Sequence, residues 1–169
     1  MELRTAAVLL VLAALAAGFG DQLGLLDRLG DSPEPPGVAR VERVVDGDTI
    51  RVRLDGRQET VRYIGVDTPE TKKPGTPVEC FGKRASAENE RLVEGERVRL
   101  EAGAEPRDRY GRLLAYVHRE PDDVFVNERL LRGGFARTLT IAPNDRYEGR
   151  FRLAEARAKG ARAGLWGQC

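Results

Sequence analysis

The sequence is poor in the residues that build several common catalytic and metal centres. Its 169 residues include one histidine, His118, and two cysteines, Cys80 and Cys169. A single histidine excludes any mechanism that needs two, and two cysteines are too few for a four-cysteine zinc site or a disulfide-rich framework. Any catalytic chemistry must therefore come from carboxylates, arginines and backbone groups.

A large excess of one charge is also missing. Lysine and arginine number 28 against 27 aspartates and glutamates, which leaves a net charge of +1. This excludes binding to nucleic acid by bulk charge, as a histone-type arm does, so any such binding depends on where the charges lie. The 33% charged and 41% apolar content is typical of a globular protein and excludes wholesale disorder and a polytopic membrane protein.

Long apolar runs are limited to one segment near the N-terminus. Residues 6–20 read AAVLLVLAALAAGFG after a start that contains Arg4, and this run is shorter than the roughly 20 residues of a membrane span. An A-x-A cleavage option ends at Ala16, so we expect residues 1–20 to be a signal peptide, or else an uncleaved N-terminal membrane anchor. Either alternative implies a protein that is secreted or anchored on the outer side of the cell membrane.

The next segment, residues 21–37, is rich in proline, glycine and acid and is expected to be a linker. The folded domain is then expected over residues 38–169. Export bears on the two cysteines, because an oxidising compartment favours pairing of distant thiols. We expect a disulfide between Cys80 and Cys169, the alternative being two inert free thiols.

Alternating apolar and polar residues predict β-structure at the start of this domain, and Asp-Gly dipeptides between the alternating runs are typical of tight turns. Later segments combine helical apolar stripes with two further strand patterns. We expect strands at residues 39–45, 49–54, 59–66, 97–101 and 112–118, helices at 79–94, 127–134 (with Asn127 as N-cap) and 145–162, and loops at 68–77 and 102–111. Such a set without βαβ alternation predicts an α+β fold, most simply a small barrel completed by helices.

Candidate site residues lie where the early strands end. Asp48 follows the first strand, and Asp67 and Glu70 follow the third, so a meander brings these carboxylates together. Calcium prefers hard oxygen ligands, which Asp48, Asp67 and the carbonyl of Thr68 can supply. Arginines can bind a phosphate with forked donors, and Arg62 and Arg112 are the candidates.

Simpler interpretations of the same residues remain open at this point. Asp-Gly and Asp-Thr-Pro segments are common turn formers, so Asp48 and Asp67 can be structural. Arg62 and Arg112 can be surface ion-pair residues, and Glu70 a solvated loop carboxylate. Spacing alone does not decide between these interpretations and a catalytic site.

Three long motifs carry a resemblance: VDGDT at residues 45–49, VRYIGVDTPET at 61–71 and DRYGRLLAYV at 108–117. With FGKRAS, VNERLLRGGFA and the closing GLW, the sequence resembles the thermonuclease family, the staphylococcal nuclease-like domain, from Val41 to Trp166. The resemblance implies a five-stranded OB-fold barrel with three helices. It also implies calcium-dependent hydrolysis of phosphodiester bonds in DNA and RNA.

The resemblance assigns roles to individual residues. It implies calcium ligands at Asp48, Asp67 and the Thr68 carbonyl, phosphate-binding arginines at Arg62 and Arg112, and a general base at Glu70. It also makes Tyr110 a substrate contact, and Arg109, Lys72, Lys73 and Lys83 are weaker candidates that add positive charge around the substrate groove. One departure concerns Leu139 and Ile141, which stand where the family's namesake has two tyrosines, so base stacking is lost there and the family's base preference does not carry over.

We therefore expect an exported, monomeric, calcium-dependent nuclease. The alternative is a catalytically silent OB-fold module that binds nucleic acid, because domains of this fold also occur as binding units. A third hypothesis, a calcium-stabilised adhesion module, explains neither arginine. All five polar residues of the expected catalytic set, Asp48, Arg62, Asp67, Glu70 and Arg112, are present, which favours the enzyme.

Overall fold

The computed structural model describes residues 37–71, 75, 77–120 and 122–169. The expected signal peptide or anchor (1–20), almost all of the expected linker (21–37), Lys72 and Lys73 lie outside these residues. No described helix has the length and apolarity that a membrane span requires. The strands are β1 (Val38–Asp46), β2 (Thr49–Leu54), β3 (Arg57–Tyr63), β4 (Gly65–Asp67), β5 (Arg97–Arg107), β6 (Leu113–Arg119), β7 (Val124–Phe125) and β8 (Arg137–Leu139), and the helices are α3 (Gly82–Val93), α4 (Val126–Arg132), α5 (Glu148–Gly160) and α6 (Leu165–Gln168).

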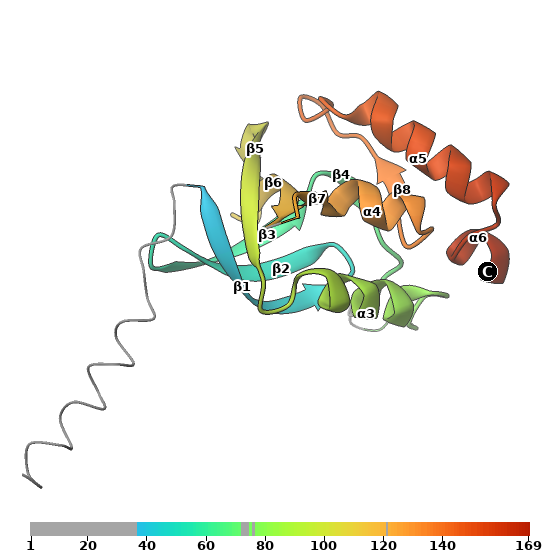
Figure 1. The fold of residues 1–169 in the computed structure, drawn as a ribbon, viewed down its shortest axis with the longest axis horizontal. Helices are drawn as coiled ribbons and strands as arrows, with labels where there is room; N and C mark the ends of the chain where they lie inside the picture. The colour runs from blue at the N-terminus through green and yellow to red at the C-terminus, as the bar shows by residue number, and fades with distance from the viewer. Residues whose placement is uncertain (1–36, 72–74, 76, 121) are drawn as a thin grey trace, which may run out of the picture. The chain divides into compact units, whose positions relative to one another are not determined.

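Five strands close into a barrel (Figure 1). They follow the order β3-β2-β1-β5-β6, and a parallel pairing of β3 with β6 closes the ring. Alternate residues of these strands point inward, and the fully buried ones include Ile50, Val52, Val61, Val98 and Val117. With the helices α3, α4 and α5, this barrel confirms the expected α+β, OB-type architecture.

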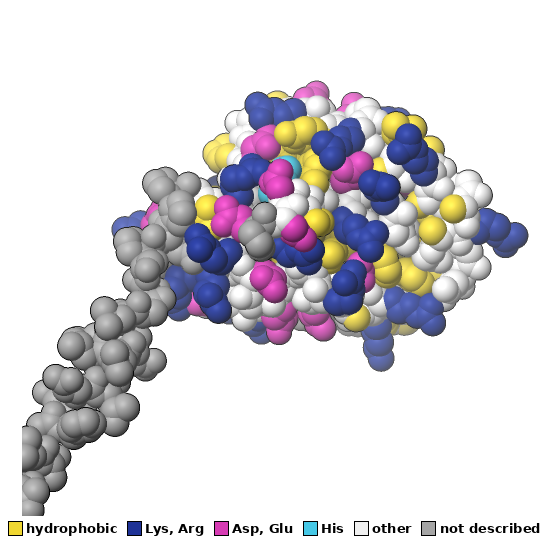
Figure 2. All heavy atoms as spheres, viewed as in Figure 1, with side chains coloured by type: hydrophobic (Ala, Val, Ile, Leu, Met, Phe, Trp, Pro, Cys, Tyr) yellow, Lys and Arg dark blue, Asp and Glu magenta, His cyan; other side chains and the backbone are white. Residues whose placement is uncertain are grey.

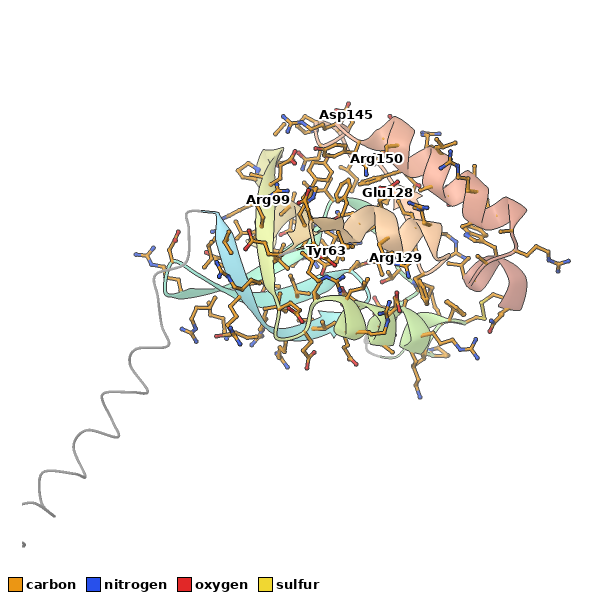
Figure 3. All side chains as sticks on the ribbon, in the orientation of Figure 1. Tyr63, Arg99, Glu128, Arg129, Asp145 and Arg150 are labelled. Atoms are coloured by element: carbon orange, nitrogen blue, oxygen red, sulfur yellow. A yellow bond between two sulfur atoms is a disulfide. The ribbon has the colours of Figure 1, made fainter. Side chains whose placement is uncertain are left out.

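The helices cover the barrel in two places. Helix α3 packs beside β1, whereas α4 packs against both α5 and β6. An ion pair of 2.5 Å between Glu128 of α4 and Arg150 of α5 joins the two helices at the surface (Figure 3). Beneath it, Phe151 of α5 lies among the aromatic rings of Tyr116 and Phe125, with ring centroids 6.2 and 5.4 Å away. The predicted apolar stripe of the last helix is therefore the face that closes the core.

The expected third strand, 59–66, is in fact broken. Strand β3 ends at Tyr63 and β4 begins at Gly65, which has a φ of +78°. A Cβ at Gly65 would lie 2.4 Å from the Phe151 ring, so the bend requires glycine. This bend carries the chain out of the barrel, where β4 pairs with β8, a strand that the sequence did not predict.

The expected loop 102–111 is also partly wrong, because β5 continues to Arg107. The reason is a distant side chain: Asn144 accepts a hydrogen bond from the Glu105 N–H (2.9 Å) and donates one to the Glu105 carbonyl (3.0 Å). The amide of Asn144 thus acts as a strand partner. The outer helices are shorter than expected, since α3 begins at Gly82 after a left-handed Phe81, and α5 spans Glu148 to Gly160.

Asn127 is not the N-cap of α4, which was the expectation. The helix begins at Val126, and Asn127 is fully buried within it. Its Oδ1 accepts a hydrogen bond from the Val117 N–H (2.9 Å), and its Nδ2 donates one to the Ile64 carbonyl (2.8 Å). Asn127 therefore ties the central strand β6 to the residue at the β3–β4 bend.

Replacing Asn127 with alanine is expected to lower the free energy of unfolding by about 3 kcal/mol, because the change leaves two buried backbone groups without partners. Urea denaturation followed by circular dichroism measures this value. Glu128→Gln, at the neighbouring position of the same helix, removes only a surface ion pair and should cost less than about 1 kcal/mol. Equal effects of the two substitutions would contradict the bridging role of Asn127.

The expected disulfide is confirmed. Cys80 and Cys169 are bonded, with Cα atoms 6.0 Å apart and a separation of 89 positions in the sequence. The bond joins the segment just before α3 to the residue that follows α6. It therefore fastens the C-terminal residues to the part of the chain that leads into α3.

Candidate active site

One small polar cavity of about 110 Å³ gathers the residues expected at the site. They come from several parts of the barrel's rim: the β1–β2 turn, the ends of β3 and β4, the loop after β4, and the residue before β6. The β2–β3 register sets Thr49 opposite Arg62, and the parallel β3–β6 pair sets Arg62 opposite Leu114. The lining residues are Asp46, Asp48, Thr49, Arg62, Asp67, Thr68, Pro69, Glu70 and Arg112.

Asp48 is almost fully buried, with 5% of its surface exposed. Its Oδ2 accepts hydrogen bonds from the Thr68 N–H (2.8 Å) and hydroxyl (2.9 Å), and its Oδ1 accepts one from the Thr49 hydroxyl (3.1 Å). A Cβ at Gly47 would lie 2.6 Å from the Thr68 hydroxyl oxygen, so the glycine permits this close approach. The two segments DGDT and DTPE are thereby joined through Asp48.

Arg62 lies between two carboxylates. Its Nη1 is 3.2 Å from Oδ1 of Asp48, and its Nη2 is 3.1 Å from Oδ1 of Asp67. Nη1 also donates hydrogen bonds to the carbonyls of Val66 (2.8 Å) and Tyr63 (3.1 Å). The bend at Gly65 makes these contacts feasible because it folds the end of β4 back toward the side chain. The guanidinium is therefore fixed in the wall of the cavity.

Arg112 is positioned by Asp108, a residue that the sequence did not single out. Oδ2 of Asp108 accepts a hydrogen bond from Nε of Arg112 (2.6 Å), and Oδ1 accepts those from the backbone N–H groups of Arg112 (3.0 Å) and Tyr110 (2.9 Å). Burial alone would raise the pKa of Asp108, but the hydrogen bonds from Arg112 and Tyr110 hold it below its usual value. The motif DRYGR, with an aspartate four residues before the arginine, was the available signal for this role.

The carboxylates around the cavity disfavour one another's ionisation. Burial, and next the charge of Asp48, raise the pKa of Asp46 to about 6. Burial also raises the pKa of Asp67, although the Arg62 guanidinium opposes this shift. The cavity is lined by four carboxylates and two arginines. The excess of negative charge favours a bound cation.

The β1–β2 turn is stabilised by Asn89, another residue that the sequence did not single out. Asn89 of α3 is fully buried, donates a hydrogen bond to the Asp46 carbonyl (2.9 Å) and accepts one from the Tyr63 hydroxyl (2.9 Å). Its position on the buried face of α3 was the only signal. Asn89 therefore links helix α3 and the end of β3 to the turn that carries Asp48, and it fixes the position of that turn.

Glu70 is held by Glu79, which the sequence also did not reveal. The Glu70 N–H donates to Oε2 of Glu79 (3.1 Å), and the Glu79 N–H donates to the Glu70 carbonyl (2.9 Å). Oε1 of Glu70 accepts a hydrogen bond from the Thr71 N–H (2.8 Å). The loop that carries Glu70 is therefore clamped to the segment that leads into α3.

A second, larger cavity of about 480 Å³ adjoins the first and shares Arg62 and Arg112 with it. Leu139 and Ile141 line this cavity together with Tyr110, whose side chain is 69% exposed. The Arg109 guanidinium lies 4.8 Å from the centre of the Tyr110 ring and donates a hydrogen bond of 2.7 Å to its hydroxyl. Tyr110 and Arg109 thus line the larger cavity, which adjoins the small one.

No group of three or more histidine, cysteine, aspartate or glutamate side chains has the arrangement of a metal site within the described part of the chain. The calcium ligands expected from the sequence are a smaller set, two carboxylates and one backbone carbonyl. Asp48 and Asp67 both line the small cavity together with Thr68.

Comparison with known proteins identifies the family. Residues 60–168 match the family model described as "Staphylococcal nuclease homologue". Thermonuclease of Staphylococcus hyicus is 40% identical over 169 residues, covering 98% of this chain and 99% of that protein. Thermonuclease of Staphylococcus intermedius is 47% identical over 126 residues (75% and 74%), and endonuclease YncB of Bacillus subtilis is 45% identical over 128 residues (75% and 60%). Since the family model matches more than half of the chain and a relative aligns along nearly all of it, this protein belongs to the staphylococcal nuclease family.

Proposed function

We propose that this protein is an exported, calcium-dependent nuclease that hydrolyses phosphodiester bonds of DNA and RNA. One observation carries the proposal: two arginines and three carboxylates expected to do this chemistry line one cavity of about 110 Å³. The thermonuclease and endonuclease relatives support a nuclease. Export rests on the apolar sequence of residues 6–20.

Arg62 and Arg112 bind the phosphate in this proposal. Each is already oriented by fixed partners, Arg62 by two carboxylates and two carbonyls and Arg112 by Asp108. Guanidinium groups match the oxygens of a phosphate with two parallel donors. Because both arginines are held before substrate arrives, little reorganisation is needed when negative charge grows on the phosphorus oxygens in the transition state.

The cavity fits calcium. Asp48 and Asp67 supply carboxylate oxygens and Thr68 a carbonyl, which are the hard ligands that calcium prefers. A volume of about 110 Å³ also holds bound water beside an ion, since one water occupies about 30 Å³. The mutual repulsion of Asp46, Asp48 and Asp67 is relieved by a cation. When bound, calcium supplies Lewis-acid neutralisation of the phosphodiester oxygens.

Glu70 is the proposed general base. Glu79 holds the backbone on both sides of it, so its carboxylate can orient a water molecule and accept its proton. Ordinary carboxylates are weak bases at neutral pH, since their pKa lies near about 4.3. We therefore expect a contribution at the lower end of general-base catalysis, and expect positioning and electrostatics to dominate.

Base selectivity is expected to be weak. Leu139 and Ile141 give the larger cavity apolar walls without aromatic rings to stack on a base. Of its two lining tyrosines, Tyr63 is buried and Tyr110 is exposed. Stacking contributes roughly 1–3 kcal/mol per base in proteins that bind single strands. The proposed enzyme therefore recognises phosphate and sugar more than base identity.

The test is degradation of single-stranded DNA, duplex DNA and RNA at slightly alkaline pH, with calcium and with EGTA. We expect degradation with calcium, none with EGTA, and a rate about a hundredfold lower for Glu70→Gln because the general base is removed. Glu90→Gln, an exposed position on α3, is the matched control and should leave the rate unchanged. Degradation that persists in EGTA would show that the metal site is misassigned, and a folded protein that binds but degrades nothing would favour the silent OB-fold module.

A further inference from the structure

At one end of the domain, basic side chains have few acidic neighbours. The whole chain has a net charge of only +1, so a cluster of cations in one place must be balanced by acids elsewhere. In Figure 2 dark blue is spread over the whole visible face, but the end of the domain that carries α6 and the last turns of α5 shows almost no magenta, which gathers over the barrel. We define the C-terminal basic surface as five exposed cations of this region: Lys83, Arg84, Arg137, Lys159 and Arg162.

Three of these cations, although they come from distant segments, contact the same C-terminal helix α6. Nζ of Lys159 lies 4.4 Å from the centre of the Trp166 indole ring, and the guanidinium carbon of Arg137 lies 5.5 Å from it. Arg84 donates a hydrogen bond to the side chain of Gln168. The disulfide between Cys80 and Cys169 fixes the start of α3 beside this same segment. The surface is therefore built by α3, β8, α5 and α6 together.

The cations of this surface have few acidic partners. Lys159 pairs with Glu155 at 3.3 Å, but Lys83, Arg84 and Arg162 form no ion pair with any carboxylate among the described residues. The arginines in the first half of α5 behave differently, because they are neutralised by acids at short range: Arg150 by Glu128 and Arg152 by Glu148. The basic surface is thus open to an anionic ligand, whereas the first half of α5 is not.

Strand β8 connects this surface to the candidate active site. Arg137, at its start, pairs in register with the calcium-ligand candidate Asp67, and Leu139, two residues later, lines the larger cavity. Residues two apart on a strand lie about 6.6 Å apart. On the other side, Lys83 follows shortly after Glu79, which clamps the Glu70 loop. The basic surface therefore lies next to the small cavity.

We propose that the C-terminal basic surface binds the phosphate backbone of the nucleic acid strand as it leaves the active site. This inference rests on the proposed nuclease function and names the path of its substrate. Contacts between phosphates and Lys or Arg do not depend on sequence, which suits an enzyme with little base selectivity. A strand bound in the active site brings its next phosphates over Arg137 and then over the cations around Trp166. Long substrates consequently bind more tightly than short ones.

The test compares two triple variants that lose the same charge. Arg84→Gln/Lys159→Gln/Arg162→Gln removes three cations of the surface, none of which lines either cavity. The control, Arg91→Gln/Arg146→Gln/Arg152→Gln, removes three arginines that are paired with acids elsewhere. Steady-state kinetics with a dinucleotide and with a long single-stranded oligonucleotide give KM and kcat for each.

We expect the surface variant to raise KM at least tenfold for the long strand, with kcat unchanged and with no change for the dinucleotide. Its binding should also depend less on salt, with the slope of log K against log salt concentration smaller by about 2, because three single-strand phosphate contacts of about 0.7 each are lost. The control variant should behave like the unmodified protein. Equal effects on long and short substrates, or equal effects of both triple variants, would overturn the proposal.

Two further measurements separate this proposal from its alternatives. Fluorescence anisotropy of a labelled oligonucleotide on Glu70→Gln in EGTA reports binding without cleavage, so the surface can be tested even if the unmodified protein proves inactive. Loss of oligonucleotide binding in the surface variant then supports the surface while the nuclease proposal fails. Binding to phosphatidylglycerol vesicles that depends on the three cations, with unchanged oligonucleotide binding, would overturn the proposal in favour of a membrane contact.

Discussion

Replacing Arg62 or Arg112 with alanine is expected to lower the rate of phosphodiester hydrolysis about a thousandfold while the protein remains folded. Removing one preorganised donor from an oxyanion site typically costs about a hundredfold to a thousandfold in rate. Each arginine offers a fork of two donors, so the upper end of this range applies. The loss should appear mainly in kcat, because the interaction strengthens as negative charge develops on the phosphate.

Conservative variants and a nearby control sharpen this prediction. Arg62→Lys and Arg112→Lys keep the charge but lose the fork, so we expect them to recover only part of the lost rate. Arg107→Ala removes an arginine that forms a bidentate ion pair with Glu59, at 2.8 and 3.0 Å, and lines neither cavity described above. It should leave the rate within a few-fold of the unmodified protein. A loss below about tenfold for either alanine variant would contradict the proposed phosphate clamp.

The two arginines should differ in their effect on calcium. Arg62 forms ion pairs with both carboxylates proposed to bind the ion, whereas Arg112 pairs with Asp108. Removing Arg62 takes a positive charge away from the calcium ligands, so the calcium concentration needed for half-maximal residual activity should fall for this variant. Arg112→Ala should leave it nearly unchanged. A general collapse of the site would change the calcium requirement of both variants. A change in the Arg62 variant alone therefore indicates the loss of a specific contact.

The sequence was sufficient for the parts of the fold that depend on local patterns. Alternation and Asp-Gly turns located β2 correctly and predicted β1 with small errors at its ends. The bend at Gly65 was missed because the glycine is required by Phe151, a residue far away in the sequence. Asn127 was assigned to a helix N-terminus for the same reason: its partners Val117 and Ile64 are brought to it only by the closed barrel.

The same limit applies to the candidate site. Motifs indicated the residues that can touch a phosphate or a metal, since these lie in short characteristic segments. Residues that position them were not indicated: Asn89 and Glu79 act on Asp46 and Glu70 across 43 and 9 positions of sequence. A net charge near zero likewise conceals the C-terminal basic surface, because summed charge contains no information on placement. Positioning and charge placement are properties of the folded chain.

Removing the disulfide with the double substitution Cys80→Ser/Cys169→Ser is expected to lower the free energy of unfolding by about 4 kcal/mol, because in the chain-entropy model the bond closes a long loop in the unfolded state. The cysteines are separated by 89 positions in the sequence, so we expect a value at the upper end of the roughly 2–4 kcal/mol that a disulfide typically contributes. For a domain of this size the melting temperature should fall by roughly 10–15 °C. Differential scanning calorimetry and urea denaturation measure both values.

The expected stability change is separable from any change at the active site. Cys80 and Cys169 line neither the small nor the large cavity, so kcat for a dinucleotide at low temperature should stay within a few-fold of the unmodified protein. Reducing the unmodified protein with dithiothreitol should reproduce the melting temperature of the double variant, since the same bond is lost without any substitution. If instead the unfolding free energy falls by less than about 1 kcal/mol, the loop is already constrained in the unfolded chain, and contacts such as those of Trp166 with Arg137 and Lys159 hold the C-terminal segment in place.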